Sequence, residues 1–193
     1  MGSWAAFYVE GRDEAATAEA CAEWLSENRS AWARLTKKAV RQTAVSDLDL
    51  ANNWTLLGAA KKPRRVAVYR QSPRWVTTFY GSFCAPNELA EHVSRRLECV
   101  VVDTQGQTTS DAYLVTVLDR GACKRELEFA ADVGWIKNDG GALDGEPVPL
   151  ETEPEDEPGE GWFDHKAVTR YLQSVFDIAW WELPHSTGAI LVG

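Results

Sequence analysis

The chain has 193 residues, of which 45% are hydrophobic and 25% charged. These fractions are usual for a folded globular protein and exclude intrinsic disorder over most of the length. Acidic residues outnumber basic ones by 29 to 20, and the net charge is -9, which argues against a nucleic-acid-binding protein that works by broad phosphate neutralisation and suits one with a basic partner.

The first half of the chain is expected to begin with a strand and a helix. Residues 4–9 are aromatic and β-branched, and they predict the strand. Asp13 is then placed to cap a helix over residues 14–28, whose apolar side chains recur at helical spacing. Residues 31–60 are consistent either with one strand or with a short helix followed by a strand.

A hairpin and a second helix are predicted next. Residues 66–70 and 75–80 are two β-rich runs, and the connection between them contains Pro73, whose missing N–H does no harm in a turn. Asn87 is the expected cap of the following helix, which has an apolar stripe formed by Leu89, Val93 and Leu97.

Three further strands are expected in the middle of the chain. Residues 98–103 are largely apolar and predict a central strand, and the polar residues 104–111 predict a turn. Residues 112–118 and 124–130 predict a hairpin with Gly121 in its turn. Because the charged residues of 124–130 do not alternate cleanly with apolar ones, we expect this strand near an edge of the sheet.

The last part of the chain predicts a long loop and a helix. Residues 134–162 hold six glycines, four prolines and nine of the 29 acids, so we expect a long acidic loop at about 136–162. Asp164 is then the expected cap of a C-terminal helix at about 164–177, with Phe163 packing on Val168.

This order of elements predicts an α+β fold, with a mostly antiparallel sheet and two or three helices packed on one face. We expect residues 1–193 to form a single domain. The chain has no run of about 18 apolar residues, no N-terminal basic region of a secretory signal, and four well-separated cysteines, so we expect a cytoplasmic protein with free thiols and no membrane association.

Charge is unevenly distributed along the chain. Residues 1–74 carry 12 bases and 8 acids, whereas residues 75–193 carry 8 bases and 21 acids. Six bases and no acid lie between Ala51 and Asn87, and seven acids and no base lie between Glu146 and Glu160. We refer to Glu146–Glu160 as the acidic run. It is either a solvated loop that faces the basic segment across the fold, or one of two separate charged faces for two kinds of contact.

No residue pattern assigns a catalytic centre, a metal site or a cofactor. The three histidines have no metal-ligand spacing, and no glycine pattern resembles a nucleotide-binding loop. Cys84, expected just before a helix, is the best candidate nucleophile. Because His92 lies about two helical turns away from it, its base would have to be His165 or His185.

The nine tryptophans either cap the core under long loops or act as aromatic anchors of a binding surface. The stretch Lys61–Tyr80 interleaves basic and aromatic residues, as single-stranded nucleic-acid platforms do. The total charge of the chain opposes that interpretation, so we do not expect nucleic acid as a partner.

A block of residues in the second half of the chain resembles a pattern in small bacterial proteins that include immunity proteins of polymorphic-toxin systems. The block comprises Asp111-Ala112-Tyr113-Leu114, Gly121, Arg125-Glu126-Leu127-Glu128-Phe129, Asp132, Gly134-Trp135 and Gly140-Gly141. It covers about 30 of the 193 residues. The resemblance implies a single-domain, cytoplasmic, non-catalytic protein and assigns no site residues.

We therefore expect a non-enzymatic, acidic protein-binding protein of the immunity or inhibitor type, with a basic, toxin-like protein as its partner. The residues expected to bind that partner are Glu151, Glu153, Glu155, Asp156, Glu157 and Trp162. One alternative is an enzyme with a cysteine-based site or a site between the sheet and the long loop. A second alternative is a structural or assembly component.

Overall fold

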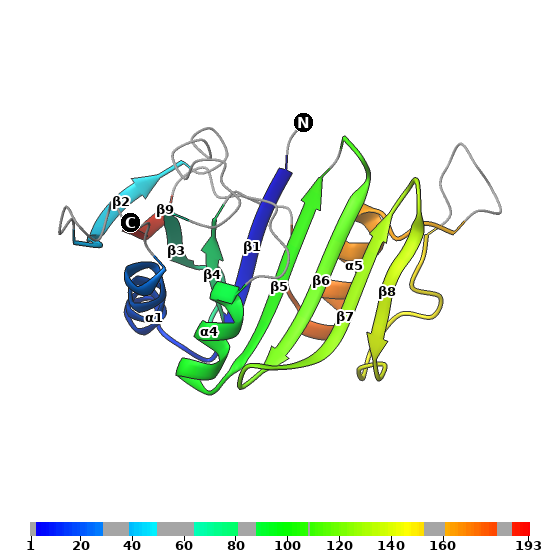
Figure 1. Cartoon of the computed structure of the whole chain (residues 1–193), viewed down its shortest axis with the longest axis horizontal. Helices are drawn as coiled ribbons and strands as arrows, with labels where there is room; N and C mark the ends of the chain where they lie inside the picture. Colours follow the sequence, from blue (N-terminus) through cyan, green and yellow to red (C-terminus); the bar gives the residue numbers. More distant parts are fainter. Residues whose placement is uncertain are drawn as a thin grey trace.

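A computed structural model describes residues 3–28, 39–49, 64–80, 88–107, 109–152, 161–180 and 187–193 of the chain. In this part of the chain, nine strands form one antiparallel sheet on which three helices pack (Figure 1). The helices are α1 (Glu14–Glu27), α4 (Glu88–Leu97) and α5 (His165–Phe176). The predicted α+β class with a mostly antiparallel sheet is confirmed.

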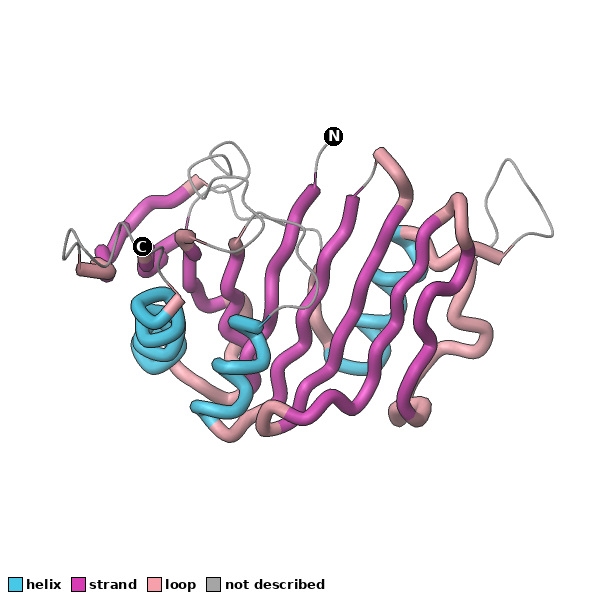
Figure 2. The backbone as a smooth tube through the Cα atoms, in the orientation of Figure 1, coloured by secondary structure: helices cyan, strands magenta, loops and turns pink. Residues whose placement is uncertain are grey.

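The strands are β1 (Ser3–Glu10), β2 (Gln42–Leu48), β3 (Val66–Arg70), β4 (Trp75–Phe79), β5 (Val100–Gln107), β6 (Ala112–Asp119), β7 (Ala122–Ala130), β8 (Gly134–Gly140) and β9 (Thr187–Val192). Their order in the sheet is β2-β9-β3-β4-β1-β5-β6-β7-β8. Strands β5 to β8 follow one another as a meander, whereas β9 inserts between β2 and β3 (Figure 2). The end of the chain therefore lies beside its first half.

Helices α1 and α4 cover one face of the sheet. Side chains alternate along β1, so that Phe7 and Val9 point to this face and are buried with Cys21 of α1 and Val93 of α4. The predicted cap of α1 is confirmed, because the N–H of Ala16 donates to Asp13 Oδ1 at 2.7 Å. These two helices meet the expectation of two or three helices on one face.

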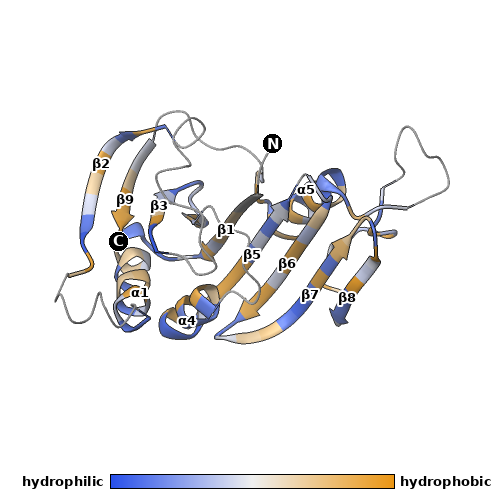
Figure 3. Cartoon of the chain, turned by 45° about the horizontal axis from the view of Figure 1, so that its top comes forward, coloured by the Kyte–Doolittle hydropathy of each residue, from blue (hydrophilic) through white to orange (hydrophobic). Residues whose placement is uncertain are grey.

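Helix α5 covers the opposite face, over the half of the sheet that contains β5 to β7, and Figure 3 shows it on the far side of these strands from α4. Tyr8, which points away from Phe7, is buried with Leu172 of this helix. Asp164 caps α5 as predicted, because it accepts a hydrogen bond from the N–H of Ala167 at 2.9 Å. Phe163 lies in the same cluster.

Several predicted boundaries are corrected by the structure. Strand β5 continues to Gln107 through residues expected to turn, and β8 occupies the start of the expected loop at 136–162. Strand β9 was not expected at all. Strand β7 is the second strand from the edge, as expected, with β8 pairing to its outer side. Asn87 and most of residues 31–60 lie outside the described residues, although β2 shows that part of this region joins the same sheet.

Candidate functional site

The segment of residues 141–152, which carries the first acids of the acidic run, is anchored to the face of the sheet that α5 covers. Arg125 of β7 binds Glu146 through two nitrogens, with Nη2 2.6 Å from Oε1 and Nε 3.3 Å from Oε2. The two side chains are only 4% and 5% exposed. Arg125 also donates to the carbonyl of Asp139, and Glu146 also accepts from the N–H of Leu143. The buried pair therefore has its charges compensated and fixes the start of the segment.

The end of the same segment is held from α5 and from β8. The guanidinium of Arg170 donates to three successive backbone carbonyls, at 2.8, 3.0 and 2.9 Å, which belong to Pro149, Leu150 and Glu151. The indole N–H of Trp135 donates to Glu151 Oε1 at 2.7 Å. Glu151, predicted to bind a partner, thus also ties its own segment to the sheet.

Thr152 and Trp162 form a fixed stem at the two ends of the remaining acidic run. Each donates its N–H to the carbonyl of the other at 2.9 Å, and the hydroxyl of Thr152 donates to Asp164 Oδ1 at 2.9 Å. The half-buried ring of Trp162 lies 6.2 Å from that of Phe129 and packs against the core under α5. The stem therefore lies beside the β8 edge of the sheet and is held to the cap of α5.

Of the six predicted partner-binding residues, the structure describes two. Glu151 and Trp162 are brought together by the stem, and both make contacts within the chain. Glu153, Glu155, Asp156 and Glu157 lie in the part of the chain outside the described residues. Their role in binding stays a prediction.

Two arginines of the basic segment pair with acids far from the stem. Arg70 Nη2 lies 2.8 Å from Glu14 Oε2, and Arg74 Nη2 lies 2.6 Å from Glu10 Oε1. The hydrogen bond from Arg70 lowers the pKa of Glu14. Four strands lie between β4 and β8. The resulting five strand spacings, of about 4.8 Å each, amount to about 24 Å. These two arginines therefore do not face the stem, whereas residues 153–160 of the acidic run lie outside the described residues, so both interpretations of the run stay predictions.

Exposed apolar side chains occur in the elements that adjoin the stem. Among the described residues, the large hydrophobic side chains that are exposed are Val133, Ile136 and Val148, at 68%, 48% and 95%. They belong to the β7–β8 turn, to β8 and to the anchored segment. This end of the molecule therefore combines apolar side chains with acids, as protein-binding surfaces do.

The tryptophans whose side chains the structure describes are either buried in the core or half-buried beside the stem. Trp24, Trp75 and Trp180 are buried. Trp135 and Trp162 are half-buried beside the stem, and the ring of Trp135 lies 5.6 Å from Phe129 in an edge-to-face arrangement. The aromatic rings of this cluster hold β8 and the stem against α5, so they serve packing whether or not they also contact a partner.

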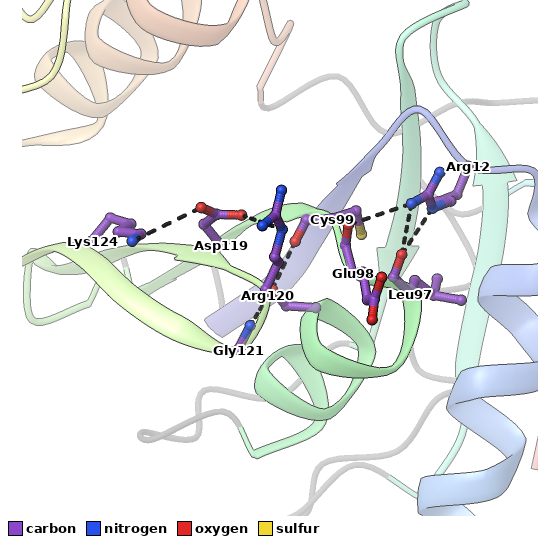
Figure 4. Close-up of polar contacts among 9 residues, drawn as sticks. Arg12, Leu97, Glu98, Cys99, Asp119, Arg120, Gly121 and Lys124 are labelled. Atoms are coloured by element: carbon purple, nitrogen blue, oxygen red, sulfur yellow. Dashed lines mark hydrogen bonds and ion pairs between the residues drawn. The ribbon is translucent and has the colours of Figure 1, made fainter.

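A shallow pocket of about 310 Å³ lies at one end of the sheet, where three turns meet (Figure 4). Its lining includes Arg12, Cys99, Asp119 and Arg120. The guanidinium of Arg12 is engaged by the carbonyl of Leu97, at 3.1 and 2.7 Å from Nε and Nη2. Burial raises the pKa of Cys99 to about 11, so its thiol is protonated near neutral pH and is a poor nucleophile.

The other thiols and imidazoles do not form a catalytic pair in the described residues. Burial raises the pKa of Cys21 to about 12 and raises that of the exposed Cys123. His92 Nε2 lies 3.9 Å from Glu23 Oε2 between α1 and α4, and His165 is on the exposed first turn of α5. Cys84 and His185 lie outside the described part. No group of three or more metal-ligating side chains is found among the residues that the structure describes.

Sequence reasoning missed the residues that position the stem, namely Arg125, Glu146, Arg170 and Trp135. The sequence contains one sign of the buried arginine, because Arg125 alternates in phase with the apolar Leu127 and Phe129. In the structure, all three side chains lie on one face of β7 and are buried. A charged residue in phase with an apolar face indicates a buried partner. Neither Arg170 nor Trp135 differs in its sequence context from an ordinary surface residue.

No family model, no curated protein and no solved structure matches this chain. None of the helices in the described ranges is long and apolar enough to cross a bilayer.

Proposed function

We propose that this chain is a non-enzymatic protein-binding protein of the immunity or inhibitor type, and that its acidic end docks a basic protein such as a toxin. The docking surface is the β8 end of the sheet: the stem formed by Thr152 and Trp162, the acidic run that the stem carries, and the exposed side chains Val133, Ile136 and Val148.

The observation that carries this proposal is the separation of the stem from Arg70 and Arg74, two arginines of the basic segment. Arg70 is paired with Glu14 of α1, and Arg74 is paired with Glu10 at the end of β1. Because the stem lies far from these two bases, we expect the acids that it carries to retain their field for an external partner. The exposed apolar side chains beside it support contact with a protein rather than with a small cation.

In this proposal, the acids govern the association rate and the apolar side chains govern the dissociation rate. The acids accelerate encounter with a basic surface through long-range attraction, which salt screens with a Debye length of about 8 Å at physiological ionic strength. The apolar side chains and the rigid stem set the dissociation rate, because close packing forms only after encounter. Anchoring the stem in advance reduces the ordering cost of binding.

Affinity capture from the source cell's lysate, at low and at moderate salt, tests the proposal. The bait is the full chain, and a matched bait has Glu153, Glu155, Asp156 and Glu157 changed to Gln or Asn. A control bait changes four acids at the other end of the molecule to Gln, and so has the same net charge as the first variant. These acids are Glu19, Glu27, Glu88 and Glu91.

We expect one stoichiometric basic protein that is lost from the first variant and retained by the second, with weaker capture at moderate salt. Equal loss from both variants would show that net charge alone drives capture. No stoichiometric partner on the unchanged chain at either salt would contradict the proposal and favour the enzyme alternative.

A further inference from the structure

Two arginines near the β2 edge of the sheet keep their side-chain charges uncompensated. Arg41 directly precedes β2 and Arg65 directly precedes β3, and both are exposed. Neither guanidinium makes a hydrogen bond or an ion pair with any of the residues that the structure describes. By contrast, Arg70 at the end of β3 is bound to Glu14. The charges of Arg41 and Arg65 are therefore available to a ligand.

The two arginines lie in one row across the sheet, with a glycine between them. Strand β9 lies between β2 and β3 (Figure 1). Gly193, which follows β9, exchanges both backbone hydrogen bonds with Arg41, at 3.1 and 3.0 Å. On its other side Val192 pairs with Val66, so Arg65 lies opposite Gly193. Because residues that are directly opposite in antiparallel pairs share a face, Arg41 and Arg65 point to the same side of the sheet.

The glycine leaves the space between the two side chains open. A Cβ added to Gly193 would meet Cγ of Arg65, and Cβ of Arg65 at 3.2 Å, so the side chain of Arg65 leans over Gly193 towards Arg41. Two strand spacings, about 10 Å, separate the two backbones, and both long side chains are able to reach one group placed between them. Thr43, exposed two residues after Arg41, points to the same face and adds a hydroxyl.

The chain around this row is strongly basic. Residues 29–46 hold five bases and no acid, and residues 51–87 hold six bases and no acid. Eight strand spacings, about 38 Å, separate β2 from β8, which is far beyond the Debye length of about 8 Å. The acids at the β8 end therefore do not cancel the local field of the two arginines, although the net charge of the chain is -9.

We propose that Arg41 and Arg65 form a binding site for a phosphate-type oxyanion, which the two guanidinium groups hold from both sides above Gly193. A guanidinium presents its N–H donors in a planar fork that matches two oxygens of a phosphate. Two forks on opposite sides suit a group with oxygens in several directions, whereas a single fork is enough for a carboxylate. This inference is independent of the proposed partner-binding function, because the site lies at the other end of the sheet and uses none of its residues.

An NMR titration of the full chain tests the inference, with the arginine Nε–H signals and the backbone amide of Thr43 as reporters. The probes are inorganic phosphate and a short single-stranded oligonucleotide, and sodium chloride at matched ionic strength controls for screening. The double variant R41Q/R65Q removes both guanidinium groups. The matched control is R95Q/R120Q, which removes two exposed arginines from α4 and the β6–β7 turn.

We expect saturable binding of phosphate that is about tenfold weaker or more in R41Q/R65Q, because two charge-assisted contacts are lost, and that is retained in R95Q/R120Q. The oligonucleotide arm identifies the source of the oxyanion. Tighter binding of the oligonucleotide, with a salt slope that falls by about 1.4 in R41Q/R65Q, would support a nucleic-acid backbone, since each lost phosphate contact accounts for about 0.7. Binding of free phosphate without tighter binding of the oligonucleotide would support a small phosphate ligand.

Shifts that chloride reproduces at the same ionic strength would overturn the inference, as would the absence of saturable binding of either probe. Equal weakening in the two double variants would overturn it too, because net charge alone would then explain binding. Far-UV circular dichroism verifies that each variant is folded. If R41Q/R65Q does not fold, the single variants R41Q and R65Q replace it, and each should weaken binding about threefold or more.

Discussion

The buried pair of Arg125 and Glu146 should contribute strongly to stability, and removing its acid should be costly. Glu146→Gln keeps the size of the side chain and removes its charge, which leaves the guanidinium of Arg125 uncompensated at 4% exposure. Breaking a buried ion pair by removing one partner costs about 3–5 kcal/mol. For a chain of this size, that corresponds to a fall in Tm of roughly 6–20 °C.

A matched control lies on the same strand. Glu126 of β7 binds Lys137 at 2.7 Å, nearly the same distance as in the buried pair, but its side chain and that of Lys137 are 25% and 42% exposed. Glu126→Gln should therefore cost about 0–1 kcal/mol. The comparison contrasts a buried arginine pair with a partly exposed lysine pair on the same strand and at nearly the same contact distance.

Urea unfolding followed by circular dichroism at neutral pH measures both variants. The double variant R125M/E146L, which replaces the pair by apolar side chains, should recover most of the stability lost in E146Q. If E146Q lost less than about 1 kcal/mol, or no more than E126Q, then the pair would not be the anchor of the segment of residues 141–152.

Three further changes test other parts of the fold. Asp164→Ala should lower the free energy of unfolding by about 1–2 kcal/mol, because it removes the cap of α5, and thermal unfolding against wild type measures the loss. Gly140→Ala should destabilise far more than Gly134→Ala in the same measurement. Both glycines have positive φ, but of the two only Gly140 would bring an added Cβ against a backbone carbonyl, that of Lys124. Iodoacetamide labelling at pH 8, followed by mass spectrometry, should modify Cys123 long before Cys99. The pKa of Cys99, about 11, lowers its thiolate fraction about 100-fold relative to a thiol of pKa 9. Rapid labelling of Cys99 would contradict its burial, and selective rapid labelling of Cys84 would favour the enzyme alternative.

Local sequence signals predicted the elements that short-range chemistry determines. Asp13 and Asp164 both cap helices as expected, since a capping carboxylate needs only the first turn that follows it. The hairpin of β3 and β4 was likewise predicted, because two β-rich runs flank a short turn. In these cases the interacting groups are close in sequence.

Elements that depend on distant contacts were missed. Strand β9 exists because β2 and β3 pair with it on both sides, from more than a hundred residues earlier. Strand β8 begins at Gly134 and ends at Gly140, and these glycines suggested a loop. Both have positive φ, which suits the ends of a strand where the chain turns. Tyr80 donates to the buried carboxylate of Asp103 at 2.8 Å, so a polar residue sits inside β5 where composition suggested the end of the strand.

The candidate site was predicted in part. The acidic run was identified from composition, and the structure places its stem at the β8 end of the sheet. The anchoring residues could not be inferred, because Arg125, Glu146 and Arg170 meet only after α5 packs on the sheet. A sequence shows which charges exist, but the fold decides which of them are neutralised internally.

The most direct test of the account is the association rate of the captured partner, measured over a range of salt concentrations. We expect neutralisation of Glu153, Glu155, Asp156 and Glu157 to slow association about tenfold or more at low salt and to flatten its salt dependence. The control with four acids neutralised near α1 and α4 should associate as the unchanged chain does. An association rate that neutralisation of the acidic run leaves unchanged would contradict the claim that this run steers the partner.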